Sequence, residues 1–336
     1  MPVGLLIMRF DERYGTKVLA NYPEKADLSM QTLLHLYGTH QYTGEPGMIS
    51  LLVGDVNVAS YYTGPESNYY IILMLKVDED ADIYEAGIAQ ASRRILENLK
   101  DDYYIEILSA IYYRICDFPF YTQEQLLATS YIEDVKRFTI NLLKQEGVFT
   151  KSELSVLLKD KRDEENIDLD VILEELVKLG LIKVASVAGM GSDLIFHINT
   201  LLIMRKPPND VFREFGKKGY LNQLTTTYRG YIKEFFNDYT PSEEDSLRLA
   251  AILINSDVYG VLKLLRVMVA TNSELEKLRQ RGVGDVEKAI NTLIRYNLVQ
   301  SFEDEQSNKY YALISDVYVK LIFPKDIINN IITGYE

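Results

Sequence analysis

The chain begins with apolar runs separated by short polar segments. Val3 to Phe10 is almost entirely apolar, which predicts a strand with both faces covered. The charged tip Asp11 to Gly15 follows, and Gly15 can take the positive φ that a short hairpin loop requires. Thr16 to Tyr22 then alternates apolar and polar residues more clearly. The pattern therefore predicts an N-terminal β-hairpin.

One helix, three strands and two helices are expected next. Asp27 precedes an apolar stripe and is the expected N-cap of the first of these helices. The expected elements are helix Leu28–His40, strands Met48–Val53, Val56–Tyr62 and Tyr69–Val77, and helices from about Ile83 to Leu99 and from Tyr104 to Cys116. For residues 1–117 this order predicts an antiparallel five-stranded sheet with flanking helices, and an α+β class for the chain.

Beyond Phe118-Pro119 the apolar spacing becomes helical, and one order of elements occurs twice. Residues 130–204 and 256–328 are each expected to fold as three short helices followed by a β-hairpin, which is the order of a winged-helix domain. The segments EELVKLGLIKVASV and NTLIRYNLVQSFED align where the third helix meets the hairpin. A helical connector is expected over residues 205–255.

The composition indicates the cellular compartment and the distribution of charge along the chain. A chain of 336 residues is long enough for two or three domains. Its net charge of −13 is uneven: residues 1–120 carry 9 basic and 17 acidic side chains, and residues 201–336 carry 18 of each. No apolar run has the length of a transmembrane helix, and the single Cys116 fits a reducing compartment. A soluble cytoplasmic protein is expected.

Few residues suggest chemistry. Gly189-Met190-Gly191 precedes a predicted strand, which fits a wing turn better than a phosphate-binding loop that opens a helix. His35 and His40 are five residues apart and do not share a helix face as a metal-binding pair would. The sequence contains neither a P-loop nor a GxSxG motif, and Cys116 has no nearby histidine. We therefore expect no enzyme activity, no cofactor and no metal site.

Winged helices raise the question of DNA binding, which requires basic or amide side chains on the third helix. In the first such domain this helix carries Asp168, Asp170, Glu174 and Glu175, which would repel phosphates. The second offers four basic residues, mixed with acidic ones: Arg279, Arg281, Lys288 and Arg295. DNA binding is therefore not favoured, and only the second domain is a candidate for it.

Residues 1–117 resemble a longin-type domain, in the order of their elements and in the segment GLLIMRFDERYGTKVLANYPE. With the winged helices that follow, the layout is similar to the nitrogen permease regulator-like family. That resemblance implies a scaffold in complexes that regulate Ras-like small GTPases. Some members assist GTP hydrolysis with an arginine in the loop before the last strand, but the corresponding loop, residues 63–68, contains none. Arg13, in the hairpin tip, is the remaining candidate for that role, but an ordinary turn residue is the favoured interpretation.

The resemblance also implies a binding groove between the first helix and the edge strand after it. Its residues here would be Leu36, Tyr37, His40, Leu51 and Val53. The leading hypothesis is a non-enzymatic adaptor or scaffold for GTPase regulation or vesicle trafficking. Its partner would be a longin or roadblock protein, in a homo- or heterodimer, or a small GTPase. The alternative is a transcription regulator that binds DNA through the second winged helix and uses the longin-like domain as a sensor or dimerisation module.

Overall fold

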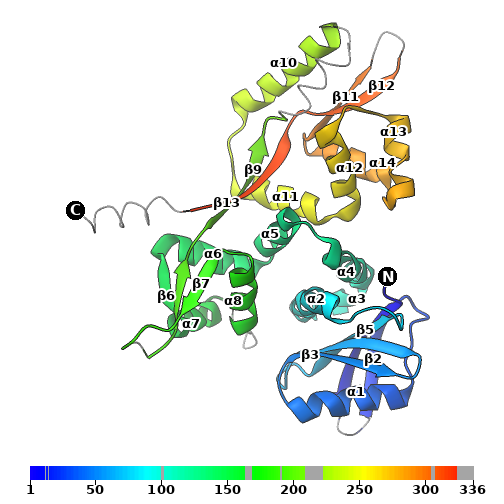
Figure 1. Ribbon diagram of the computed structural model, residues 1–336, viewed down its shortest axis with the longest axis vertical. Helices are drawn as coiled ribbons and strands as arrows, with labels where there is room; N and C mark the ends of the chain where they lie inside the picture. The colour runs from blue at the N-terminus through cyan, green and yellow to red at the C-terminus, as the bar shows by residue number, and fades with distance from the viewer. Residues whose placement is uncertain are drawn as a thin grey trace. The chain divides into compact units, whose positions relative to one another are not determined.

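Two units make up the chain, Met1–Tyr121 and Thr122–Glu336. The computed structural model describes residues 1–11, 13, 15–99, 102–162, 169–189, 191–208, 222–303 and 307–323. Figure 1 shows an α+β protein, as predicted, with a larger sheet in the first unit and small antiparallel sheets among helices in the second. None of the described helices is both long and apolar enough to cross a membrane.

The first unit is built on a five-stranded antiparallel sheet in the order β2-β1-β5-β4-β3. Its strands are β1 (Gly4–Asp11), β2 (Gly15–Tyr22), β3 (Gly47–Val53), β4 (Val56–Tyr62) and β5 (Tyr69–Leu75). The predicted antiparallel five-stranded sheet is confirmed. The order leaves β2 and β3 at the two edges.

Helices cover both faces of this sheet. Helix α1 (Met30–Thr43) lies on one face, and α2 (Glu85–Glu97) and α4 (Leu108–Asp117) lie on the other (Figure 1). Successive residues of a strand point to opposite faces, so Leu5 and Ile7 of β1 pack with α2 and α4, whereas Leu6 and Met8 pack with α1. This double burial explains why β1 is apolar on both faces from Leu5 to Met8, before the exposed Arg9.

Helix α1 begins and ends later than the sequence pattern predicts. The N-cap is Ser29, whose hydroxyl accepts a hydrogen bond from the Thr32 amide at 3.1 Å, and not Asp27. The Asp27 carboxylate instead accepts from the amide of Leu28 at 2.9 Å, ahead of the helix. At the other end, Gly44 takes φ 70° and stops the helix.

The second unit contains one series of elements twice. We call residues 122–206 the first repeat and residues 242–322 the second repeat. The first repeat comprises α5 (Gln123–Ile132), α6 (Asp134–Glu146), β6 (Val148–Thr150), α7 (Lys151–Arg162), α8 (Leu169–Lys178), β7 (Ile182–Ala185), β8 (Leu194–His197) and β9 (Thr200–Lys206). The second comprises α11 (Glu243–Ile254), α12 (Ser256–Val267), β10 (Ala270–Thr271), α13 (Asn272–Glu276), α14 (Val286–Arg295), β11 (Val299–Glu303), β12 (Lys309–Leu313) and β13 (Asp316–Ile322). Helix α10 (Asn222–Asp238) precedes the second repeat.

The repeats share local geometry as well as order. Each has a three-stranded antiparallel sheet, β6-β8-β7 in the first and β10-β12-β11 in the second. After α8 and α14, Gly180 and Asn297 take positive φ values of 74° and 53°. The amide of the next residue, Leu181 or Leu298, then donates to a carbonyl of the preceding helix at 3.0 or 2.9 Å. The aligned segments EELVKLGLIKVASV and NTLIRYNLVQSFED thus adopt the same turn.

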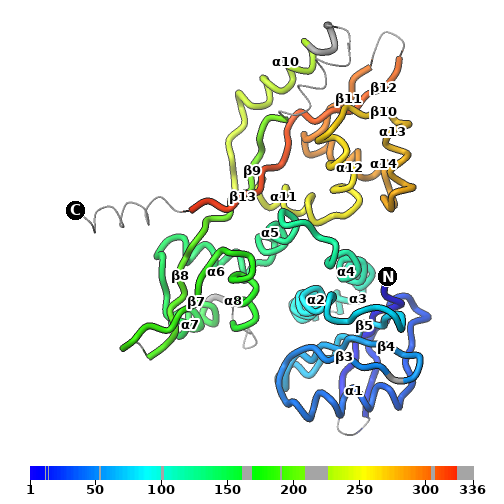
Figure 2. The backbone as a smooth tube through the Cα atoms, in the orientation of Figure 1, coloured from blue at the N-terminus to red at the C-terminus, as the bar shows by residue number. Residues whose placement is uncertain are grey.

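A two-stranded antiparallel sheet joins the repeats. Strand β9 continues from β8 and strand β13 continues from β12, and the two pair with each other, as Figure 2 traces. Thr200 pairs with Ile322 and Lys206 with Asp316, so each strand's first residue meets the other's last. The register is symmetric about the central pair Ile203 and Val319. The two repeats therefore meet as the halves of a two-fold dimer meet, within one chain.

Two helices add to this junction. Helix α5 packs against α11, and Leu127 of α5 shares a hydrophobic core with Leu249 and Leu253 of α11. The segment predicted as a connector, residues 205–255, thus contains the end of β9, α10 and α11. The sequence pattern did not predict β9 or β13 as strands of their own.

Candidate functional site

The helix residues of the predicted groove lie mostly inside the first unit. Leu36 and His40 are fully buried between α1 and the sheet. Tyr37 is half-buried and stacks on Phe10 of β1, with ring centroids 3.6 Å apart. These three side chains hold α1 on its own sheet, so the structure leaves little of them for a partner.

His40 is held in the neutral form by this burial. Its Nε2 lies 3.0 Å from the Ser60 hydroxyl, and the rings of Tyr62 and Tyr70 lie 5.7 and 5.5 Å away. Burial lowers the pKa of His40 to about 4, and a hydrogen bond with the backbone of Ser60 opposes that shift only in part. His40 is therefore a neutral packing residue at pH 7.

The strand residues of the predicted groove lie at the sheet edge. Leu51 is half-buried and packs with the core beneath α1, and Val53 is the last residue of β3. Leu52, the residue after Leu51, points to the opposite face of the strand and is 60% exposed. Among the described strands, only β4 pairs with β3, which leaves the N–H and C=O groups of its outer side for another strand. The accessible part of this site is thus the β3 edge with Leu52, a residue that the sequence pattern did not single out.

Arg13 lies in the turn between β1 and β2 and is exposed. Its backbone amide donates to the Asp11 carboxylate at 2.8 Å. In the loop between β4 and β5, Asn68 takes a positive φ of 57° and donates to the carbonyl of Phe10 at 3.3 Å. In both loops these hydrogen bonds stabilise the turn itself.

The four basic residues that are candidates for DNA binding lie on or before α14. Arg279 donates to Glu276 at 2.6 Å and to the carbonyl of Gly284 at 3.2 Å. Arg281 is exposed in the same short turn. Lys288 and Arg295 line a shallow hollow of about 450 Å³, whose other residues are Asp285, Glu287, Asn291 and Thr292. This surface mixes positive and negative charges, which weakens its attraction for phosphates.

The acidic residues of α8 are paired with lysines of their own repeat. Asp170 pairs with Lys151, Glu174 with Lys178, and Glu175 with the buried Lys136. Asp168 lies outside the described residues. These ion pairs lie within the first repeat. They leave α8 without a positively charged surface.

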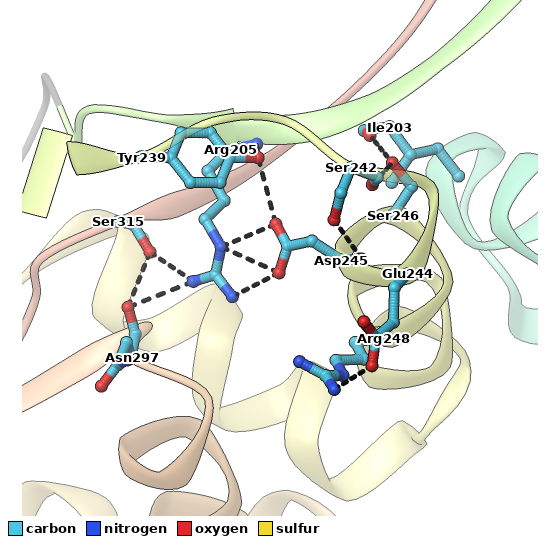
Figure 3. Close-up of polar contacts among 10 residues, drawn as sticks. All are labelled: Ile203, Arg205, Tyr239, Ser242, Glu244, Asp245, Ser246, Arg248, Asn297 and Ser315. Atoms are coloured by element: carbon cyan, nitrogen blue, oxygen red, sulfur yellow. Dashed lines mark hydrogen bonds and ion pairs between the residues drawn. The ribbon is translucent and has the colours of Figure 1, made fainter.

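A buried ion pair that the sequence did not reveal ties the two repeats together (Figure 3). Arg205 of β9 donates from Nε and Nη2 to the carboxylate of Asp245 on α11, with distances of 2.8 to 3.2 Å. Its Nη1 donates to the hydroxyl of Ser315 at 3.0 Å and to the carbonyl of Asn297 at 3.2 Å. The Tyr239 hydroxyl donates to Asp245 at 3.0 Å. Arg205 thus connects a strand of the first repeat to three segments around the second.

A second arginine also links the repeats, but it belongs to the second repeat and binds a residue of the first. Arg266 of α12 donates to Glu124 of α5 at 2.6 Å and to Asp316 of β13 at 2.7 Å. The Thr122 hydroxyl, at the start of α5, lies 3.0 Å from the hydroxyl of Tyr259. A single sequence cannot identify such partners because they lie far apart in the chain: Arg266 is 142 positions from Glu124 and 50 from Asp316.

Within the described residues, no group of three or more His, Cys, Asp or Glu side chains could hold a metal ion. No model of a protein family matches the chain, and a search of curated proteins finds no significant match.

Proposed function

We propose that the chain is a non-enzymatic adaptor that binds a protein partner along the β3 edge of its first unit. In this proposal the first unit is a longin-type domain and each repeat of the second unit contains a winged helix. The partner is another longin or roadblock protein, or a Ras-like small GTPase. The adaptor would act in the cytoplasm, in GTPase regulation or vesicle trafficking.

The observation that carries the proposal is the open β3 edge. A seven-residue edge strand offers a row of backbone donors and acceptors, and partners use such edges by adding a strand. Natural edge strands are usually blunted by a charge, a proline or a bulge. Strand β3 reads GMISLLV and contains neither a charged residue nor a proline, and its pairing with β4 shows no register shift. An edge left unprotected in this way suits a binding surface.

The order of elements supports the longin and winged-helix parts of the proposal. A β-β-α-β-β-β-α-α chain with helices on both sheet faces is the order that the longin resemblance implies. In each repeat the last three helices (α6 to α8, or α12 to α14) and the three-stranded antiparallel sheet suit a winged helix. We do not propose a catalytic role for Arg13, because its backbone amide bonds to Asp11 within the turn and its side chain is exposed.

Capture by the immobilised full chain tests the proposal. The probes are purified small GTPases of the source cell, each loaded with GDP or a GTP analogue, and purified longin and roadblock proteins. Leu52→Lys places a charge on the β3 edge and should reduce capture at least tenfold. Val77→Lys is the matched control, because Val77 is 55% exposed but lies outside β3. The proposal fails if no probe is retained above a denatured control, or if both variants behave alike.

A further inference from the structure

The sheet β6-β8-β7 of the first repeat has an apolar face that is only partly covered. We call this side the outer face, and it carries Val148, Leu194, Phe196 and Ile198, since side chains alternate along β8 and Val148 pairs with Phe196. Val148 is 42% exposed and the other three are half-buried. Ile195, on the opposite side of β8, is fully buried in the core of the repeat. The outer face therefore has the composition of a packing surface without the burial of one.

The second repeat contains the equivalent face. The amide of Ile198 donates to the carbonyl of Leu181 at 2.9 Å, and the amide of Ile314 donates to the carbonyl of Leu298 at the same distance. These hydrogen bonds, together with the strand pairings, fix which residues of the two repeats correspond. The other equivalent pairs on the outer face are Val148 and Val269, Leu194 and Tyr310, and Phe196 and Ala312.

In the second repeat, helix α10 covers this face. Tyr228 and Ile232 of α10 form one hydrophobic cluster with face residues that include Val269, Ala312 and Ile314. The Tyr228 hydroxyl also donates to a backbone carbonyl of β12 at 2.6 Å. As a result Val269 is only 2% exposed, whereas its equivalent Val148 is 42% exposed. The two repeats thus share the face, and among the described residues only the second repeat has a helix on it.

The chain that follows β13 leaves from the border of the uncovered face. Ile322, the last residue of β13, pairs with Thr200, which lies two residues after Ile198. The pairing of β9 with β13 is symmetric, so Lys206 at the end of β9 pairs with Asp316 in the same way beside the second repeat. The chain after β9 leads to α10, which covers the second repeat. The chain after β13 starts from the equivalent position beside the first repeat.

Residues 324–336, which follow β13, lie outside the described residues, but their sequence PKDIINNIITGYE has the apolar spacing of an amphipathic helix. Ile327, Ile331 and Tyr335 are four residues apart and share one helix face, with Ile328 and Ile332 beside them. The residues of α10 that cover the second repeat, Tyr228, Ile232 and Phe236, have the same spacing. A helix over residues 327–335 is about 13 Å long, which matches the four-residue strand β8.

We propose that residues 327–335 of the same chain form a helix that packs on the outer face of the first repeat, as α10 packs on the second. Burial of the isoleucines against the apolar face drives the contact. A helix of this length is not stable alone in water, so it forms as it docks. Only residues 324–326 separate it from Phe323, and this short tether gives it a high effective concentration at the face. That advantage favours this segment over a second copy or another protein.

Disulfide formation in the full chain tests which segment occupies the face. Under mild oxidation, the variant Phe196→Cys/Ile331→Cys should form an intramolecular disulfide at least tenfold faster than Phe196→Cys/Asn329→Cys. The two positions are close in sequence, but Asn329 lies on the opposite side of the predicted helix. The natural Cys116 is buried and remains in both variants. Equal rates overturn the proposal. A covalent dimer of twice 38.6 kDa also overturns it, because the segment then comes from a second copy.

Hydroxyl-radical footprinting of the outer face is a second test, and it leaves the face itself unchanged. Ile331→Asp places a charge on the apolar side of the predicted helix, so oxidation of Phe196 and Leu194 should rise roughly threefold or more. Asn329→Asp is the matched control and should leave their oxidation unchanged. Equal oxidation of these two residues in the unaltered chain and in Ile331→Asp overturns the proposal. The outer face lies in the second unit and the β3 edge in the first, so the two proposals are tested independently.

Discussion

Removing the carboxylate of Asp245 should destabilise the junction between the two repeats. Arg205 is only 6% exposed, and Asp245 is 15% exposed. Asp245→Ala leaves the guanidinium buried beside Ser315 and the carbonyl of Asn297, which carry no compensating negative charge. Breaking one side of a buried ion pair costs about 3–5 kcal/mol. The partial exposure of Asp245 favours the lower end, about 3 kcal/mol.

The same helix provides the control. Glu244 and Arg248 form an ion pair one turn apart on α11, with side chains 74% and 51% exposed (Figure 3). Exposed pairs of this kind contribute about 0.3–0.5 kcal/mol. Glu244→Ala should therefore cost several-fold less than Asp245→Ala, although both remove a carboxylate from α11.

Native-state hydrogen exchange of β9 and β13 is the appropriate assay, because it reports the opening of this junction without requiring the chain to unfold in one step. About 3 kcal/mol corresponds to exchange roughly a hundred times faster, and Glu244→Ala should change the rate by about twofold. The double variant Arg205→Leu/Asp245→Ala should cost less than the sum of the single variants. Equal effects of Asp245→Ala and Glu244→Ala, or strict additivity in the double variant, would refute the reasoning.

Three further predictions concern the first unit and α14. Folding lowers the pKa of His40 from 6.5 to about 4, so the unfolded state binds the proton first as the pH falls. The first unit should therefore lose up to about 3 kcal/mol of its free energy of unfolding between pH 6.5 and pH 4. Hydrogen exchange in β4 should show this loss reduced in His40→Gln and retained in His35→Gln, which changes an exposed residue. Gly4→Ala should destabilise the first unit by about 1–3 kcal/mol, because the added Cβ would clash with Ala26. Gly38→Ala should instead stabilise it by up to about 1 kcal/mol. Denaturant unfolding measures both changes, and changes of the same sign would contradict the packing argument. The full chain should not change the electrophoretic mobility of genomic DNA fragments even at low salt, because Asp285 and Glu287 lie among the basic residues of α14. A salt-dependent mobility shift that Lys288→Glu removes would favour the transcription regulator over the adaptor.

Local patterns predicted most of the first unit because its elements are fixed by neighbours in the sequence. The unbroken apolar run of β1 required a strand covered on both faces, and both faces are covered. The N-cap of α1 was wrong by two residues, since Asp27 and Ser29 are both good caps and only the path of the chain distinguishes them. The groove residues show the same limit. Apolar residues such as Leu36 look alike in sequence whether they face a sheet or a partner, and α1 turns them toward the sheet.

The sequence by itself determined the order of elements, the sheet of the first unit and the duplicated segment in the second, because these depend on residue spacing over a few turns or strands. Only the tertiary structure decided that β9 pairs with β13, that Arg205 reaches Asp245, and that Leu52 and Leu34 are exposed while Leu36 and His40 are buried. These features arise from contacts between distant segments, and a single sequence contains no local signal of which segment will cover which.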